Sequence, residues 1–235
     1  MKTLLLKKRA IAAAVGIAGM FCVGSASANY NWSLGGTNHF ADGYKSSVLG
    51  ATTITFDALS LPSGVTYVGG KVVQGLYCGP IGTCGSVTAA PPAGDTSKYF
   101  TVGPTDGSVG SFKSTFYNSY FGFNFSSPDS YNTISFLRDG NTVISYSGTD
   151  LANQIDGVGG LVTGGDRNAS WYLNVSVDNA AQYFNEVRFS SSSNAFETDN
   201  HAFIAVPEPE TYAMLLAGLG LMGFVARRRK QAVAA

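Results

Sequence analysis

Apolar and polar residues alternate strictly along Trp171–Val177, and this pattern is the strongest fold signal in the chain. Successive side chains of a β-strand point to opposite faces. One face would therefore carry Trp171, Leu173, Val175 and Val177, and the other would carry Tyr172, Asn174 and Ser176. The alternation predicts a strand with one face in a core and the other in water.

The same signal recurs along the body of the chain. Residues 120–125 place phenylalanine at every second position, and residues 133–138 and 142–146 flank Asp139-Gly140, a dipeptide typical of a two-residue hairpin turn. Further strand candidates are residues 51–59, 65–77, 99–102, 185–189 and 195–204. No window between residues 29 and 205 shows convincing helical periodicity. We predict an all-β fold, an antiparallel, jelly-roll-like β-sandwich over residues 29–205.

The N-terminus predicts export. Basic residues within the first nine positions precede an apolar run at 10–23, and Ala26-Ser27-Ala28 fits a small-residue cleavage site. We expect signal peptidase to remove residues 1–28 as a signal peptide.

The C-terminal segment 206–230 has three parts in order: Pro-Glu-Pro, an uncharged apolar run of 16 residues at 211–226, and a basic cluster. Sixteen helical residues span ~24 Å, short of the ~30 Å core of a bilayer, so we expect a single short transmembrane helix. The basic cluster and residues 231–235 would stay cytoplasmic. The prolines would keep the preceding strap extended and accessible.

This order of elements resembles the PEP-CTERM sorting signal of Gram-negative bacteria. The matching residues are Pro207, Glu208, Pro209, Arg227, Arg228 and Arg229. The resemblance implies processing by exosortase, a membrane-embedded transpeptidase, after transient insertion into the inner membrane. It implies a destination at the cell surface or in the extracellular matrix of species that make exopolysaccharide. An ordinary C-terminal anchor is the alternative. Similar tails are also filed as C-terminal segments of ice-binding proteins, but this chain shows no regular Thr-x-Thr array.

Charge excludes one class of partner. The whole chain is formally neutral, but residues 29–206 hold seven basic and thirteen acidic residues, a net charge of −6. Nucleic-acid binding needs clustered Lys and Arg to replace counterions, so we expect no nucleic-acid partner.

Two cysteines remain after signal cleavage. Cys78 and Cys84 predict one disulfide around a short loop, which would stabilise the fold by about 2 kcal/mol. Their spacing is not that of a Cys-x-x-Cys redox pair, and a zinc site would need two further ligands nearby.

A polar stretch at residues 126–133 is a candidate for sugar binding. Asp129 and Asn132 offer hydrogen-bonding groups, and Tyr131 offers a ring on which a sugar could stack. The alternative is an Asx-type turn that contacts no ligand. Residues 126–132 and 195–200 also resemble segments of a subgroup of exosortase-dependent surface proteins, a likeness that supports the sandwich but implies no reaction.

A second candidate lies at Glu197-Thr-Asp-Asn-His201. On a regular strand Glu197, Asp199 and His201 would share one face. The spacing is similar to the Glu-x-Asp-x-Glu motif of jelly-roll glucanases, but His201 stands where the acid/base glutamate belongs, so hydrolysis is not expected. A structural calcium on Glu197 or Asp199 is one alternative, and solvated edge residues are the other.

The sequence thus favours a non-catalytic, exported surface or biofilm-matrix protein that associates with exopolysaccharide. A specific carbohydrate-binding module and a glycoside hydrolase are the alternatives. No cofactor is expected apart from structural calcium. The chain has no Gly-x-Ser-x-Gly elbow and no phosphate-binding loop.

Overall fold

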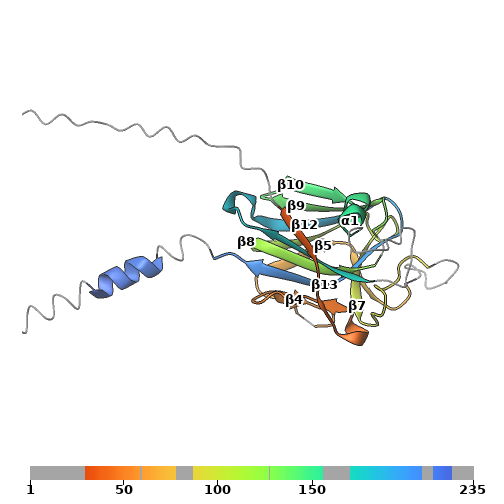
Figure 1. Ribbon diagram of the computed structural model, residues 1–235, viewed down its shortest axis with the longest axis horizontal. Helices are drawn as coiled ribbons and strands as arrows, with labels where there is room; N and C mark the ends of the chain where they lie inside the picture. Colours follow the sequence, from red (N-terminus) through yellow and green to blue (C-terminus); the bar gives the residue numbers. More distant parts are fainter. Residues whose placement is uncertain are drawn as a thin grey trace, which may run out of the picture.

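The computed structural model describes residues 30–58, 60–77, 87–126, 128–155, 170–207 and 214–223. The predicted signal peptide, Cys78 and Cys84 lie outside these residues. Antiparallel strands dominate the body (Figure 1). The strands are β1 (Tyr30–Leu34), β2 (Thr37–Asn38), β3 (Tyr44–Lys45), β4 (Thr52–Ile54), β5 (Val65–Gly69), β6 (Lys71–Gln74), β7 (Lys98–Val102), β8 (Val109–Phe125), β9 (Asn132–Arg138), β10 (Asn141–Ser147), β11 (Trp171–Val177), β12 (Phe184–Ser191) and β13 (Phe196–Ala205). Within the described residues, the body also has the helices η1 (Phe40–Asp42), α1 (Gly148–Ile155) and η3 (Ala180–Gln182).

Strand β8 belongs to both layers of the sandwich. Its 17 residues pair with β12 and β5 through their first part and with β11 and β13 through their last part. One layer therefore runs β10-β9-β12-β8-β5. The other runs β1-β11-β8-β13, with β7 and β4 both paired to the far side of β13 and β6 beyond β7. The predicted all-β antiparallel sandwich is confirmed.

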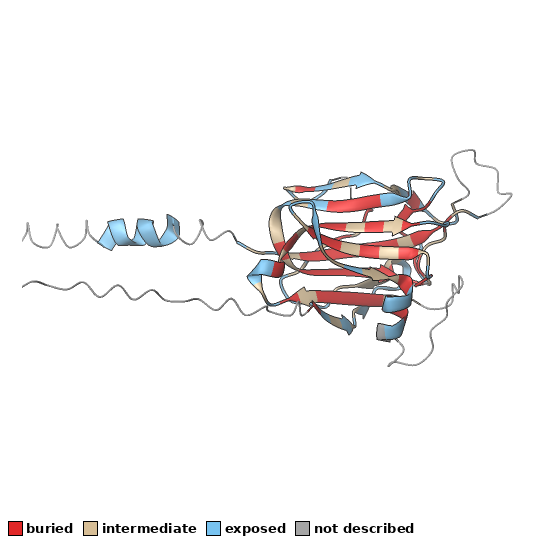
Figure 2. Ribbon diagram, turned by 90° about the horizontal axis from the view of Figure 1, so that it is seen from above, coloured by how far each residue is buried: buried red, intermediate tan, exposed pale blue. Residues whose placement is uncertain are grey.

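Aromatic side chains fill the space between the layers. Phe121, Phe123 and Phe125 of β8 are fully buried, as their alternation predicts. The ring centroid of Phe123 lies 5.3 Å from that of Phe125 and 5.6 Å from that of Phe189. Figure 2 shows the buried residues concentrated along the strands. Burial of large apolar side chains against one another is thus the main source of stability.

The hairpin predicted at Asp139-Gly140 is confirmed. Strands β9 and β10 pair antiparallel, with Arg138 opposite Asn141. Asp139 has φ 51° and Gly140 has φ 81°, the two positive values that a type I′ turn requires. Aspartate and glycine are among the residues that tolerate this geometry, so the turn is encoded locally.

The second face of β11 differs from the expectation. Tyr172 is 2% exposed and Asn174 is 8% exposed, although both were expected to be solvated. Tyr172 packs with Tyr120 and Ala202 beneath Tyr44. The Asn174 side-chain nitrogen donates to the Gly35 carbonyl oxygen at 2.8 Å. The face is dry because the segment that follows β1 folds back over it.

Helix α1 contradicts the expectation of a helix-free body. Its first turn is closed by reciprocal bonds: the Asp150 amide donates to Ser147 Oγ at 3.2 Å, and the Ser147 amide donates to Asp150 Oδ2 at 2.8 Å. These bonds hold the pKa of Asp150 below its usual value. Leu151 is fully buried and anchors the helix to the core. The Ser-x-x-Asp spacing is an acidic variant of the capping box, and it was the signal in the sequence from which this helix could have been predicted.

We expect Phe123→Ala to lower the free energy of unfolding by ~3–5 kcal/mol, because it leaves a cavity among aromatic rings. Urea denaturation of the full chain, followed by circular dichroism, measures this change. Leu49→Ala is the matched control: Leu49 is 97% exposed, and its loss should change stability by less than ~0.5 kcal/mol. Equal effects of the two substitutions would contradict the assigned core.

Candidate functional site

A β-bulge interrupts β13 within the candidate catalytic segment. The register with β8 shifts between Asp199 and Ala202, and Asn200 has φ 51°. A bulge inserts one residue and so reverses the alternation of side chains beyond it. Glu197, Asp199 and His201 therefore do not share one face, contrary to the expectation for a regular strand. His201 lies in the aromatic core, whereas Asp199 lies on the opposite face of the sheet.

The His201 imidazole is fully buried among aromatic rings. Its ring centroid lies 5.0 Å from that of Phe189 in a stacked arrangement. Tyr67 Oη lies 2.7 Å from Nδ1, and Thr198 Oγ1 lies 2.8 Å from Nε2, so both ring nitrogens are satisfied. Burial lowers the pKa of His201 to about 3, which keeps the ring neutral. A general base must reach substrate, and this ring is enclosed.

On the other face of β13, Asp199 meets Asp95. Asp199 is fully buried and Asp95 is 4% exposed. The Ser97 hydroxyl lies 2.5 Å from Asp95 Oδ1 and 3.2 Å from Asp199 Oδ2. Burial, and after it the neighbouring Asp95 carboxyl, together raise the pKa of Asp199 to about 10. Among the described residues, no Lys or Arg forms an ion pair with either carboxylate.

Two buried amides converge on the same carboxylates. Asn124 lies opposite Asp199 in the pairing of β8 with β13, and its Oδ1 accepts from the Ser170 hydroxyl at 2.6 Å. Asn200 donates from Nδ2 to the carbonyl oxygen of Asp42, the residue before Gly43. A Cβ at Gly43, where φ is 67°, would lie 2.4 Å from Asn124 Nδ2 and 2.9 Å from Asp95 Oδ2. Glycine is required there for this close approach.

We call Asp95, Asn124, Asp199 and Asn200 the buried polar cluster. Each contributes one buried atom without a hydrogen-bond partner: Asp95 Oδ2, Asp199 Oδ1, Asn124 Nδ2 and Asn200 Oδ1. Buried polar atoms are nearly always paired, so four such atoms together are unusual. Sequence reasoning missed Asp95 and Asn124, which come from distant segments. The Asp-x-Ser turn at Asp95, where the Ser97 amide donates to Asp95 Oδ1 at 2.8 Å, was the available local signal.

Glu197 makes a different contact from that of Asp199. Its Oε1 accepts from the Ala90 amide at 3.0 Å and so holds the loop before β7. Across the described ranges, no three side chains of His, Cys, Asp or Glu gather so that they could hold a metal ion. A calcium ligand set that combined Glu197 with Asp199 would therefore need further oxygens from other groups.

The sugar-binding candidates are brought together in one turn. The Asn132 amide donates to the Asp129 carbonyl oxygen at 2.9 Å, and Asn132 Oδ1 accepts from the Ser191 hydroxyl at 2.7 Å. Asp129 is 4% exposed and Asn132 is fully buried. Burial and a hydrogen bond to the Asp129 carboxylate raise the pKa of Tyr131. Tyr131 alone of the three candidates is half-buried and offers surface to a ligand.

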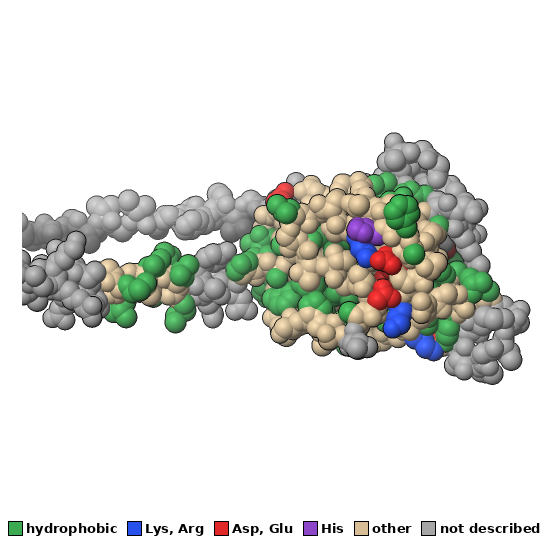
Figure 3. All heavy atoms as spheres, turned by 90° about the horizontal axis from the view of Figure 1, so that it is seen from below, with side chains coloured by type: hydrophobic (Ala, Val, Ile, Leu, Met, Phe, Trp, Pro, Cys, Tyr) green, Lys and Arg blue, Asp and Glu red, His purple; other side chains and the backbone are tan. Residues whose placement is uncertain are grey.

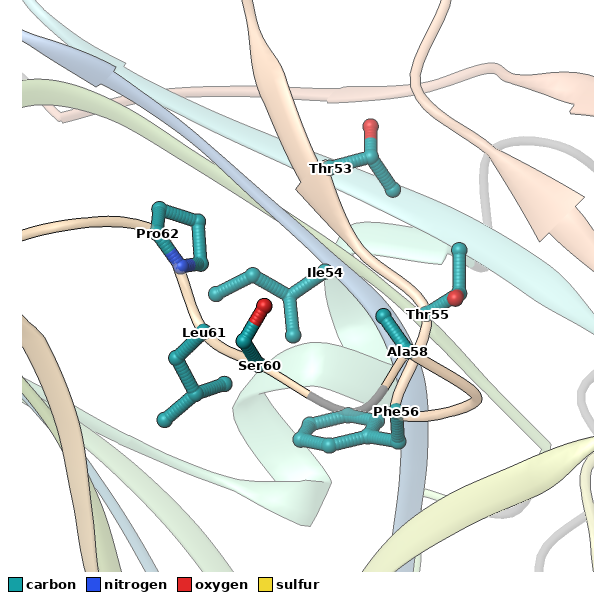
Figure 4. Close-up of a pocket in the computed structure, with 8 residues that line it drawn as sticks. All are labelled: Thr53, Ile54, Thr55, Phe56, Ala58, Ser60, Leu61 and Pro62. Atoms are coloured by element: carbon teal, nitrogen blue, oxygen red, sulfur yellow. The ribbon is translucent and has the colours of Figure 1, made fainter.

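A pocket of about 300 Å³ lies beside β4. Figure 4 shows that its lining side chains come from β4 and the loop that follows it. The lining residues are Thr53, Ile54, Thr55, Phe56, Ala58, Ser60, Leu61 and Pro62. None of these residues titrates near neutral pH, so this set provides no general acid or base.

The C-terminal segment is the part of the chain that matches a known protein family. Residues 205–230 match the family model of the PEP-CTERM protein-sorting motif. The chain carries a PEP-CTERM sorting signal. The match confirms the predicted resemblance and supports an exosortase-sorted, exported protein anchored at a bacterial cell surface. No curated protein and no solved structure matches the chain.

The PEP-CTERM signal starts where β13 ends. The Val206 amide donates to the Tyr117 carbonyl oxygen at 2.8 Å, and Pro207 is exposed. Glu208, Pro209 and the basic residues Arg227, Arg228 and Arg229 lie outside the described residues. Residues 214–223 form an exposed helix. Among the residues that the structure describes, no helix is long and apolar enough to cross a membrane.

Because the pKa of His201 falls on folding, acid should destabilise the native state through this group. Between pH 7 and 5 the His201 imidazole takes up a proton in the unfolded chain but stays neutral in the folded chain. Relative to His201→Gln, the natural chain should lose about 2 kcal/mol of unfolding free energy over this interval. Urea unfolding at both pH values measures the difference. The contribution of Asp199 has the opposite sign and is common to both proteins, so it cancels.

His39→Gln is the control for this experiment, because His39 is exposed and is the other histidine of the chain. The unfolding free energy of His39→Gln should change between the two pH values by the same amount as that of the natural chain. If His201→Gln showed the same pH dependence as the natural chain, the buried neutral imidazole would be contradicted.

Proposed function

We propose that this chain is a non-catalytic surface protein that associates with the exopolysaccharide matrix after exosortase has processed its tail. The observation that carries the proposal is the position of the sorting signal at the end of β13. This strand is hydrogen-bonded to β8 on one side and to β7 and β4 on the other. Tension applied at the signal would therefore act on an interior strand with paired neighbours on both sides, which suits a body that is held at a surface.

The positions of the candidate catalytic groups support a non-catalytic role. Glu197 holds a loop amide, Asp199 is enclosed with Asp95, and His201 is neutral within the core. Glycosidic cleavage needs two carboxyl groups on either side of an accessible sugar bond. In these positions the groups maintain the fold.

The surface supports contact with neutral or weakly charged sugars. Figure 3 shows a face on which charged side chains form a small group, surrounded by hydrophobic side chains and by atoms of the backbone and uncharged polar side chains. Hydroxyl and amide groups can exchange hydrogen bonds with sugar hydroxyls, and half-exposed aromatic rings can stack on sugar rings. We therefore propose broad, low-affinity association over this surface, in which exopolysaccharide is the partner.

Fractionation of the native host tests the proposal. The full chain should be recovered with the extracellular matrix, and it should appear in the medium when exopolysaccharide synthesis is deleted. Replacing Pro207, Glu208 and Pro209 with alanine should keep it in the membrane fraction, which controls for sorting. Retention at the surface of cells that lack exopolysaccharide would contradict association with the matrix, while leaving exosortase sorting intact.

A second measurement tests the absence of catalysis. The purified full chain, incubated with the host's exopolysaccharide, should release no reducing ends above the blank. Glu197→Gln is the matched variant. Hydrolysis by the natural chain that this substitution abolishes would contradict the proposal and favour a glycoside hydrolase.

A further inference from the structure

We propose that the buried polar cluster, Asp95, Asn124, Asp199 and Asn200, binds one calcium ion. The cluster lies between β13, the end of β8, the loop before β7 and the segment around Gly43. These four segments are far apart in sequence, so a ligand here would join the covering loops to the sheet. This inference is independent of the proposed association with exopolysaccharide.

The first argument is the orientation of unpartnered atoms. Asp95 Oδ2 and Asn124 Nδ2 both lie within 3 Å of the position that a Gly43 side chain would take. The Asn200 amide is bonded to the carbonyl oxygen of Asp42, the residue before Gly43, so it borders the same space. Its Oδ1 and Asp199 Oδ1 are buried without partners. Asp95 and Asn124, from separate elements, thus point at one small region, and Asp199 adjoins it through the Ser97 hydroxyl that contacts both carboxylates.

The second argument is charge. Two buried carboxylates lie side by side, and within the described residues no basic side chain neutralises either one. Lys45, on the covering segment, is already paired with Asp42 at 2.9 Å. Two carboxyl groups enclosed in this way need either a proton on one of them or, when both are ionised, a cation between them. A divalent cation supplies the two charges needed for neutrality.

The third argument is ligand chemistry, which favours calcium. Calcium takes six to eight oxygen ligands from carboxylates, amide oxygens, backbone carbonyls and water in flexible geometry. The cluster offers two carboxylates and the Asn200 amide oxygen. Asn124 can add a fourth group, because the Ser170 hydroxyl bonds equally well to either end of its amide, so the oxygen can face the carboxylates. Magnesium requires a tighter octahedron and dehydrates reluctantly.

Calcium titration of the full chain, purified in mild detergent, tests the site. Equilibrium dialysis with radioactive calcium should give one ion per chain. Calcium at about 5 mM, above the ~10⁻⁴–10⁻³ M dissociation constants of extracellular calcium modules, should raise the melting temperature by about 4 °C over a chelator. Magnesium at the same concentration should give a clearly smaller shift. An unchanged melting temperature together with no bound calcium would overturn the proposal and favour a proton shared between Asp95 and Asp199. An equal response to magnesium would overturn the assignment to calcium.

Variants locate the ion. Asp199→Asn should abolish both the bound calcium and the thermal shift, whereas Asp178→Asn, which alters an exposed aspartate, should keep both. Asn124→Asp keeps an oxygen at its position and should retain calcium binding. Full calcium binding by Asp199→Asn would overturn the site. If Asp199→Asn fails to fold, Asp95→Asn takes its place: it should lose the calcium that the natural chain binds, and full calcium binding by this variant would overturn the site.

Discussion

The antiparallel pairing of β13 with β8 determines how the two layers, the core and the polar face of this protein are placed. On one side of the pair, Phe203 of β13 lies opposite Phe121 of β8, and both side chains are buried in the core. On the other side, Asp199 lies opposite Asn124 beneath the covering loops. Since β8 continues into the second layer, this one ladder also joins the two halves of the sandwich.

The bulge at Asn200 places Asp199 and His201 on opposite faces of the sheet, and each side chain is buried in a different way. His201 is accommodated as a neutral ring with both nitrogens bonded, which removes the cost of a buried charge. Asp199 is accommodated beside a second carboxyl group, which stays favourable only with a proton or a cation between them. The bulge is thus where the fold creates its most unusual chemistry, as bulges often do.

The body and the tail fit one physical picture. The PEP-CTERM signal continues directly from β13, and the groups with catalytic potential on that strand are engaged within the fold. A calcium ion in the buried polar cluster would tie the covering loops to the same strand. Such a protein would be stiffened near the point where it is held, and its calcium would come from the medium outside the cell.

Local sequence determined the features that depend on neighbouring residues: the sorting signal, the Asp139-Gly140 turn, the phenylalanine alternation of β8 and the all-β class. These follow because period, turn chemistry and order of elements are properties of short segments. The length of β8, the dry second face of β11, the reversal at Asn200 and the meeting of Asp95 with Asp199 were decided by tertiary structure. Each of these features depends on which distant segment packs against a strand. The alternation of residues along one strand does not indicate which segment covers its second face.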